Sequence, residues 1–251
     1  MRKLGYLSIA ALSLVLVSCG GDDKTAPKGD VVAKTTAPAG KAWVDVVSKT
    51  AEGGFLIGNP DAKIKLVEYA AVTCSHCAEF EKEGYPDLLD KYVAGGQVNF
   101  EVRNFLLNPY DIPITILTRC SGPDAYLALT RQFYENQEAA MEPARKSDPK
   151  IFEAALKKPE GERFLALAQA MGVVEFFKAR GVSEDQAKSC LSDPKNAKEL
   201  IAMTEKATDP SGSYKVTGTP SFFLGGAPIE LSNGSPPWTQ VKSALQNAGA
   251  R

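Results

Sequence analysis

Histidine is nearly absent from this sequence of 251 residues, in which His76 is the only one. Ser/His/Asp triads, HExxH metalloprotease sites and histidine-rich metal clusters all need a histidine in another setting, so none of these is available. Glycine-rich phosphate loops are missing as well, since no GxGxxG or GxxxxGKS/T pattern stands between a strand and a helix. The sequence therefore gives no support for these hydrolases or for nucleotide chemistry.

An excess of charge of one sign is missing too. The 29 Lys and Arg residues nearly balance the 30 Asp and Glu residues, and no block of like charge stands out. Neither a nucleic acid nor an anionic lipid surface is indicated as a partner. With 44% hydrophobic residues and no internal repeat, the composition suits one full-sized globular domain with room for a smaller subdomain.

A hydrophobic run long enough to span a bilayer is the third absence. The apolar residues 7–17 follow two basic residues and are too few for a mature transmembrane helix, which is typical of an export signal. The run ends in Leu-Val-Ser-Cys, which resembles the lipobox of bacterial lipoproteins. We therefore expect a lipoprotein signal peptide over residues 1–18 and a lipid on Cys19. A plain secretory signal with a free cysteine is the alternative.

Residues 19–42 have a composition that is unable to bury a core, rich in Gly, Asp, Lys, Thr, Ala and Pro. We expect a flexible tether that holds the domain on the periplasmic side of a bacterial membrane, with an end-to-end distance of roughly 25 Å. Disulfides form and persist in that compartment, so the remaining cysteines are interpreted first as redox groups and only then as zinc ligands.

The domain begins at about residue 43 and opens with a strand, a helix and a second strand. Residues 63–69 and 98–103 alternate polar and apolar side chains, which predicts two strands. Between them, helical periodicity begins after Cys74 and stops at Gly95 and Gly96. This order is a βαβ unit, which requires a parallel sheet covered on its faces.

Residues from about 111 to 207 carry almost no strand signal and predict a block of helices. Helices are expected over 124–136, 151–156, 162–180 with a break near Gly172, from the capping box at Ser183 to about 191, and after Asp193. Beyond the block, residues 221–231 predict a hairpin that turns at a Gly-Gly pair, and a helix follows over 238–248.

Cys74 and Cys77 stand three residues apart where the predicted strand ends and the helix begins. Free N–H groups and the helix dipole at that end would stabilise the thiolate, which is the reactive form of a thiol. His76 between them adds a second stabiliser. The alternatives are a structural disulfide or half of a zinc site completed by Cys120 and Cys190, although a zinc site usually has a second closely spaced pair.

Four stretches together resemble the DsbA-like branch of the thioredoxin superfamily: residues 67–69, 73–80, 102–105 and 216–223. The resemblance covers roughly Phe55 to the C-terminus. It implies an α/β thioredoxin fold in which a helical subdomain, here about 111–207, is inserted between a βαβ half and a ββα half. One DsbA-like thioredoxin domain over residues 43–251 is the expected result.

The same resemblance assigns roles to residues. Cys74 matches the exposed nucleophile and Cys77 the resolving thiol. Thr219-Pro220 matches the cis-proline loop that packs on the CxxC and presents backbone to a substrate, with an ordinary turn as the alternative. Glu68 matches a buried acid that passes a proton to or from the inner thiol, whereas a solvent-facing strand-edge glutamate is the alternative. The central pair is Ser-His instead of the commoner Pro-His, which leaves the redox potential open.

Cys120 and Cys190 lie in segments predicted as helix, where either could be a small buried core residue. Two remaining cysteines in an oxidising compartment are more often paired, and some DsbA-like proteins carry a second disulfide in similar places. We expect a structural disulfide between them, without a catalytic role.

The expected function is a dithiol oxidase of exported proteins, because a stabilised reduced thiolate makes a stronger oxidant. An isomerase or reductase is the first alternative and a redox-inactive binding module the second. The redox-active disulfide needs no cofactor and no metal. Reduced or misoxidised exported proteins and a membrane redox protein are the expected partners. A monomer is expected, since no segment between tether and fold is available for dimerisation.

Overall fold

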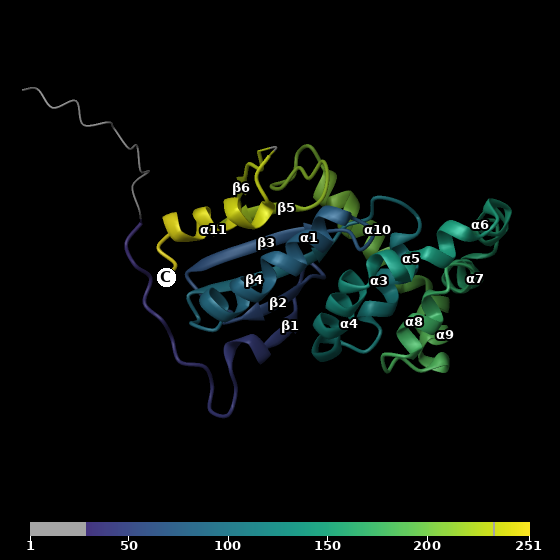
Figure 1. Cartoon of the computed structure of the whole chain (residues 1–251), viewed down its shortest axis with the longest axis horizontal. Coiled ribbons are helices and arrows are strands. Elements are labelled where there is room, and N and C mark those ends of the chain that lie inside the picture. The colour runs from purple at the N-terminus through teal and green to yellow at the C-terminus, as the bar shows by residue number, and fades with distance from the viewer. Residues whose placement is uncertain (1–28, 233) are drawn as a thin grey trace, which may run out of the picture.

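The computed structural model describes residues 29–232 and 234–251. Its described part contains one six-stranded mixed sheet in the order β1-β2-β4-β3-β5-β6, in which the β3 and β4 pair is parallel and the others are antiparallel (Figure 1). The strands are β1 (Val47–Lys49), β2 (Phe55–Gly58), β3 (Ile64–Ala70), β4 (Val98–Asn104), β5 (Ser221–Leu224) and β6 (Ala227–Ile229).

The first half of the fold is the predicted βαβ unit. β3 leads into α1 (Ser75–Glu83), and the chain reaches β4 through α2 (Tyr85–Asp87) and the π-helical segment η2 (Leu88–Val93). The prediction of one continuous helix is wrong at this break. Pro86 has no backbone N–H to donate to the preceding turn, so the α-helical ladder is interrupted there.

The two faces of the sheet have different coverings. Leu66 on β3 faces the core under α1, η2 and α11 (Pro237–Asn247), whereas Val67 and Tyr69 pack on the opposite face with Phe223. Because side chains alternate along a strand, Glu68 shares the face of Leu66 and lies on the side of α1.

The chain between β4 and β5 forms the helical insertion, with a hydrophobic core of its own that includes Phe133, Leu167 and Phe177. The predicted break at Gly172 is present, with φ +71°, and the Ser183 side chain accepts the Gln186 N–H as the capping box requires. The thioredoxin fold with a helical insertion is confirmed. The described helices are α3 (Asp111–Arg119), α4 (Pro123–Glu135), α5 (Gln137–Lys146), α6 (Pro149–Leu156), α7 (Glu160–Ala170), α8 (Val173–Lys178), α9 (Glu184–Ser192) and α10 (Pro194–Thr208).

The described part of the predicted tether, residues 29–42, lies along the domain and differs from the flexible coil expected above. Backbone N–H groups of Gly29, Val32 and Thr35 donate to carbonyls of Asn247, Gly249 and Gly95 at 2.7 to 3.0 Å. Composition misses this because backbone hydrogen bonds need no apolar side chains. Residues 19–28, the predicted signal peptide and Cys19 lie outside the described residues.

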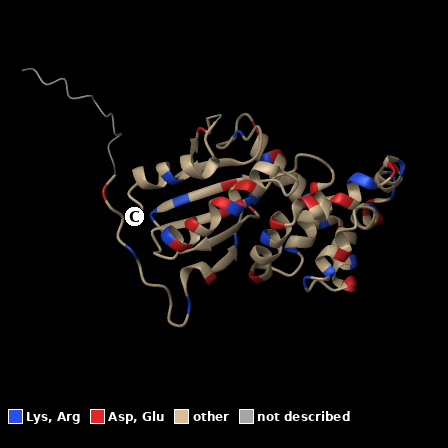
Figure 2. Ribbon diagram, viewed as in Figure 1, with Lys and Arg blue, Asp and Glu red and all other residues tan. Residues whose placement is uncertain are grey.

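Charges of both signs are interspersed along the helices next to the sheet and along those of the insertion (Figure 2). Within residues 29–232 and 234–251, no helix has the length and apolar character needed to cross a bilayer.

Candidate active site

Cys74 is the N-cap residue of α1 and has an extended backbone, with φ −77° and ψ 121°. Its Sγ accepts the backbone N–H of Cys77 at 3.3 Å, which satisfies one of the free donors at the start of the helix. Its thiol donates to the carbonyl of Thr219 at 3.3 Å. The sulfur therefore lies between a helix N-terminus and a loop 145 positions away in the sequence.

The pKa values of the two thiols of the motif are shifted in opposite directions. Hydrogen bonds from the Cys77 thiol, the Thr219 side chain and the backbone N–H groups of Cys77 and His76 lower the pKa of Cys74 from 9.0 to about 6, although burial opposes them. Burial raises the pKa of Cys77 well above its ordinary value. Cys74 is 8% exposed and Cys77 is 1% exposed, so Cys74 is the more solvent-accessible thiol, as predicted, but by a small margin. Cys74 is the group that is ionised near neutral pH.

Thr219-Pro220 lies against Cys74 and contains a cis peptide bond. The loop leaves the buried Val216, whose N–H donates to Ala207 of α10, and continues directly into β5. The predicted cis-proline loop and the CxxC are therefore brought together by the pairing of β5 with β3.

His76 has an exposed imidazole whose Nδ1 lies 3.2 Å from Oε2 of Glu79. The sequence predicts stabilisation of the thiolate by this ring. In the structure, the contribution of His76 to lowering the pKa of Cys74 comes through its backbone N–H. The imidazole instead lines the surface next to the site.

Glu68 lies on β3 and is only 3% exposed, so it is not the solvent-facing glutamate of the alternative interpretation. Burial raises the pKa of Glu68 well above its usual range, and Glu81 and Cys74 raise it further. The negative charge of Glu68 in turn raises the pKa of Cys77. A buried carboxyl whose pKa is raised in this way can exchange a proton with the inner thiol.

Comparisons with known proteins agree with this geometry. A family model described as thioredoxin matches residues 50–247. The structure of alpha-DsbA1 from Wolbachia pipientis has the same fold, with a TM-score of 0.58 at 18% identity over 78% of this chain and 91% of that one. The chain belongs to the thioredoxin family.

Two further matches bear on this thioredoxin-family chain. A protein-disulfide isomerase from Novosphingobium aromaticivorans is 31% identical, with a TM-score of 0.68, over 76% of this chain and 94% of that one. A proposed protein-disulfide oxidoreductase of Rickettsia bellii is 30% identical over 185 residues, which are 74% of this chain and 62% of that protein. The chain thus spans less than two thirds of the length of this curated relative.

Glu81 is a buried acid near the CxxC motif that the sequence analysis missed. It lies on the buried face of α1 with Cys77 and Phe80, four residues after Cys77, so helical periodicity could have revealed it. Burial raises the pKa of Glu81 to about 8, although Arg131 lies 3.6 Å away and opposes the rise. Glu81 is therefore a second buried acid near the motif, and its charge raises the pKa of Glu68.

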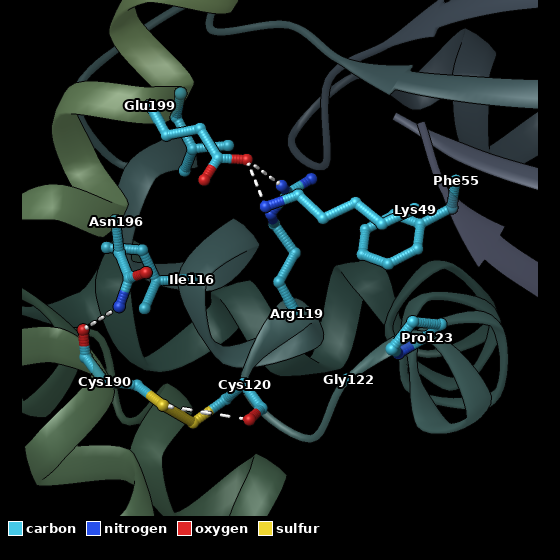
Figure 3. A pocket seen from close by; sticks show the side chains of 11 residues that line it. Lys49, Phe55, Ile116, Arg119, Cys120, Gly122, Pro123, Cys190, Asn196 and Glu199 are labelled. Atoms are coloured by element: carbon cyan, nitrogen blue, oxygen red, sulfur yellow. Dashed lines mark hydrogen bonds and ion pairs between the residues drawn. A yellow bond between two sulfur atoms is a disulfide. The ribbon is translucent and has the colours of Figure 1, made fainter. Parts of the chain in front are cut away.

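Cys120 and Cys190 form a disulfide with their Cα atoms 6.0 Å apart, and it joins the end of α3 to α9. A zinc site shared by four cysteines does not fit a pair whose sulfurs are bonded to each other. The disulfide lines a cavity of about 280 Å³ where Arg119 and Lys49 both pair with Glu199 at 2.7 Å (Figure 3). This cavity is lined by neither Cys74 nor Cys77.

A more open hollow of about 490 Å³ adjoins the Thr219-Pro220 loop beside the CxxC motif. His76, Thr219 and Pro220 line one part of it, and the chain from Leu231 to Pro237 lines another, apart from Asn233, which is not described. Cys74 does not line this hollow itself, but its thiol donates to the carbonyl of Thr219, which does.

Proposed function

We propose that this chain is an exported, lipid-anchored thiol-disulfide oxidase that introduces disulfides into periplasmic proteins through Cys74 and Cys77. The observation that supports this most directly is the position of the Cys74 sulfur, which accepts a helix N-terminal N–H while Cys77 is buried below it. A site that stabilises the thiolate of the reduced form favours release of the disulfide to a client.

The oxidation proceeds by two exchanges. A client thiolate attacks Sγ of Cys74, the bond between Cys74 and Cys77 breaks, and Cys77 leaves with the electron pair. A second client thiolate then attacks the client sulfur of the mixed disulfide and releases Cys74 as a thiolate. The client loses two electrons and gains a disulfide, and the enzyme is left with both cysteines reduced.

Glu68 supplies the proton that the first exchange needs. Cys77 departs as a thiolate in a buried position, where a charge is unfavourable, so it takes up a proton at once. The Glu68 carboxyl is a suitable donor because burial raises its pKa and so favours its protonated form. The carboxylate left behind recovers its proton when the pair is reoxidised.

An isomerase is the second candidate, and the specific observation in its favour is the 31% identity to a protein named a protein-disulfide isomerase. The two functions share the nucleophile and differ in the resting state of the pair. An oxidase acts with the disulfide formed, whereas an isomerase acts with Cys74 free to attack a client disulfide.

The proposed setting is the periplasmic side of a bacterial membrane, with lipid on Cys19 and residues before about 29 linking the lipid to the domain. The proposed clients are reduced or misoxidised exported proteins. A membrane redox protein would restore the disulfide of the monomeric enzyme after each cycle.

Trapping of clients tests the proposal. In Cys77→Ser the Cys74 thiolate attacks a client disulfide, one client sulfur leaves as a thiolate, and the mixed disulfide stays because no Cys77 thiol can displace it. Exported proteins should therefore accumulate on this variant and be released by dithiothreitol. Cys74→Ser is the matched control and should trap none. Membrane fractions of wild type and Cys19→Ala, examined in the same preparation, report the anchor. An equal yield of adducts from Cys74→Ser and Cys77→Ser would refute the assignment of the nucleophile, and a wild-type protein with an unmodified N-terminus would refute the anchor.

A further inference from the structure

The loop that joins β3 to α1 lies between two hydrophobic cores. Ala71 packs in the core of the sheet, whereas Val72, which is 1% exposed, belongs to the core of the helical insertion. Thr73 and Cys74 follow at once. The insertion is therefore in direct contact with the segment that carries the nucleophile.

Side chains of α4 and α5 bind the carbonyl groups of this loop. The hydroxyl of Tyr134 donates to the carbonyl of Ala71 at 3.1 Å. Nε2 of Gln137 donates to two carbonyls, that of Val72 at 2.7 Å and that of Cys74 at 3.1 Å. Gln137 thus fixes the backbone on both sides of Thr73.

The start of α3 holds Thr73 itself. Oδ1 of Asp111 accepts the Thr73 N–H at 2.9 Å, and Nδ2 of Asn108 donates to the Thr73 hydroxyl at 2.9 Å. Asp111 is fully buried, and its other oxygen accepts the N–H groups of Leu107 and Asn108 at 2.8 and 3.1 Å. These two bonds hold the Asp111 carboxylate in the orientation in which its Oδ1 accepts the Thr73 N–H.

We infer that these four side chains, the loop clamp of Asn108, Asp111, Tyr134 and Gln137, are positioning residues that hold Cys74 in its reactive place at the N-terminus of α1. Every residue from 71 to 74 is bound by at least one of them. Their bonds end on backbone groups and on the Thr73 hydroxyl, so they act on the sulfur through the loop. The role of the clamp rests on the proposed function of Cys74.

The effect on reactivity follows from the geometry at the sulfur. The thiolate is stabilised by the Cys77 N–H at 3.3 Å, and such a bond weakens steeply when the distance or the angle changes. A loosened loop would let Cys74 leave this position for part of the time. The thiolate would then be less stable, and the disulfide form would be a weaker oxidant.

Replacement of Gln137 by methionine tests the clamp, because Gln137→Met removes the two donated bonds and keeps the length of the side chain. Gln169→Met is the matched control, since Gln169 is an exposed glutamine of α7 in the same insertion. Thiolate absorbance at 240 nm is followed against pH in the reduced full-length proteins. The first step belongs to Cys74, because burial raises the pKa of Cys77 far above it, and Cys74→Ser should lack that step.

We expect the midpoint of the Cys74 step to rise by about half a unit to one unit in Gln137→Met, because a loosened loop weakens the bond from the Cys77 N–H to the thiolate. The control should keep the wild-type midpoint. A Gln137→Met protein with a lower melting temperature but an unchanged midpoint, or an equal shift in Gln169→Met, would overturn the clamp.

The variant Tyr134→Phe is a second test of the clamp, and it is independent of whether Gln137→Met folds. It removes one hydroxyl and leaves the ring in place, so it should raise the Cys74 midpoint in the same direction by a smaller amount. An unchanged midpoint in this variant would also overturn the clamp. If Cys74→Ser retained oxidase activity, the proposed function would fail instead, which separates the two ideas.

Discussion

At the scale of single residues, the two thiols of one motif differ in acidity because of their positions on α1. Cys74 accepts an N–H at the start of the helix, whereas Cys77, one turn later, is enclosed by the core. The reduced protein should therefore react with iodoacetamide at Cys74, with a rate that rises with pH to half its maximum near pH 6. Peptide mapping across pH 5 to 9 measures this. Preferential alkylation of Cys77 would show that the assignment is reversed.

The buried carboxyl of Glu68 makes a separate prediction. Glu68→Gln keeps the shape and removes the proton donor, so turnover should slow by roughly tenfold, a modest loss since water can replace part of the relay. The melting temperature should not fall, because a neutral amide replaces a carboxyl whose pKa is already raised. Glu83→Gln, on the exposed end of α1, is the control. An unaltered pH dependence of the rate in Glu68→Gln would argue against the relay.

Some site residues could be predicted from the sequence and others could not. Cys74, Cys77 and the Thr219-Pro220 loop carry a recognisable motif, and Glu68 stands at a fixed position before it. Gln137 and Asp111 reach the loop from 63 and 38 positions away. Their side chains have no local signal, because their role arises only when the insertion packs against the sheet.

At the scale of secondary structure elements, α1 and α11 contact each other through a glycine. A Cβ at Gly84 would lie 2.9 Å from Cβ of Trp238 on α11, closer than packing allows. Gly84→Ala should therefore destabilise the protein by about 1 to 3 kcal/mol through overpacking. Gly161→Ala in α7 is the control, with its nearest atom at 3.5 Å, and should have no such cost. Equal denaturation midpoints for the two variants would contradict this packing.

The elements that escaped prediction are short or weakly apolar. β3, β4 and the β5-β6 hairpin were predicted because they alternate or run apolar between turn residues. β1 has only three residues, and two of them are exposed, so nothing in its pattern marks a strand. α5 contains Pro143 and buries only Ala140 fully, which hides its helical period. Both are stabilised by neighbours rather than by their own sequence.

At the scale of the whole molecule, the disulfide between Cys120 and Cys190 closes a segment of 70 residues within the insertion. The double variant Cys120→Ala/Cys190→Ala should lose about 4 kcal/mol on the chain-entropy model, less any strain released, which is roughly 10 °C in melting temperature. Oxidase activity at moderate temperature should persist, because the disulfide lies outside the lining of the hollow beside Cys74. Loss of activity without loss of stability would show a catalytic role for this disulfide.

The reduction potential of the Cys74-Cys77 pair tests the central claim most directly. Wild-type protein is equilibrated with mixtures of reduced and oxidised glutathione, quenched with acid and alkylated, and the disulfide is counted by mass spectrometry. The proposed oxidase should form it reversibly, with a midpoint between about −180 and −120 mV, the range of oxidising members of the superfamily. A midpoint near −270 mV, typical of a reductase, or no disulfide between these two cysteines at any ratio would contradict the proposed oxidase.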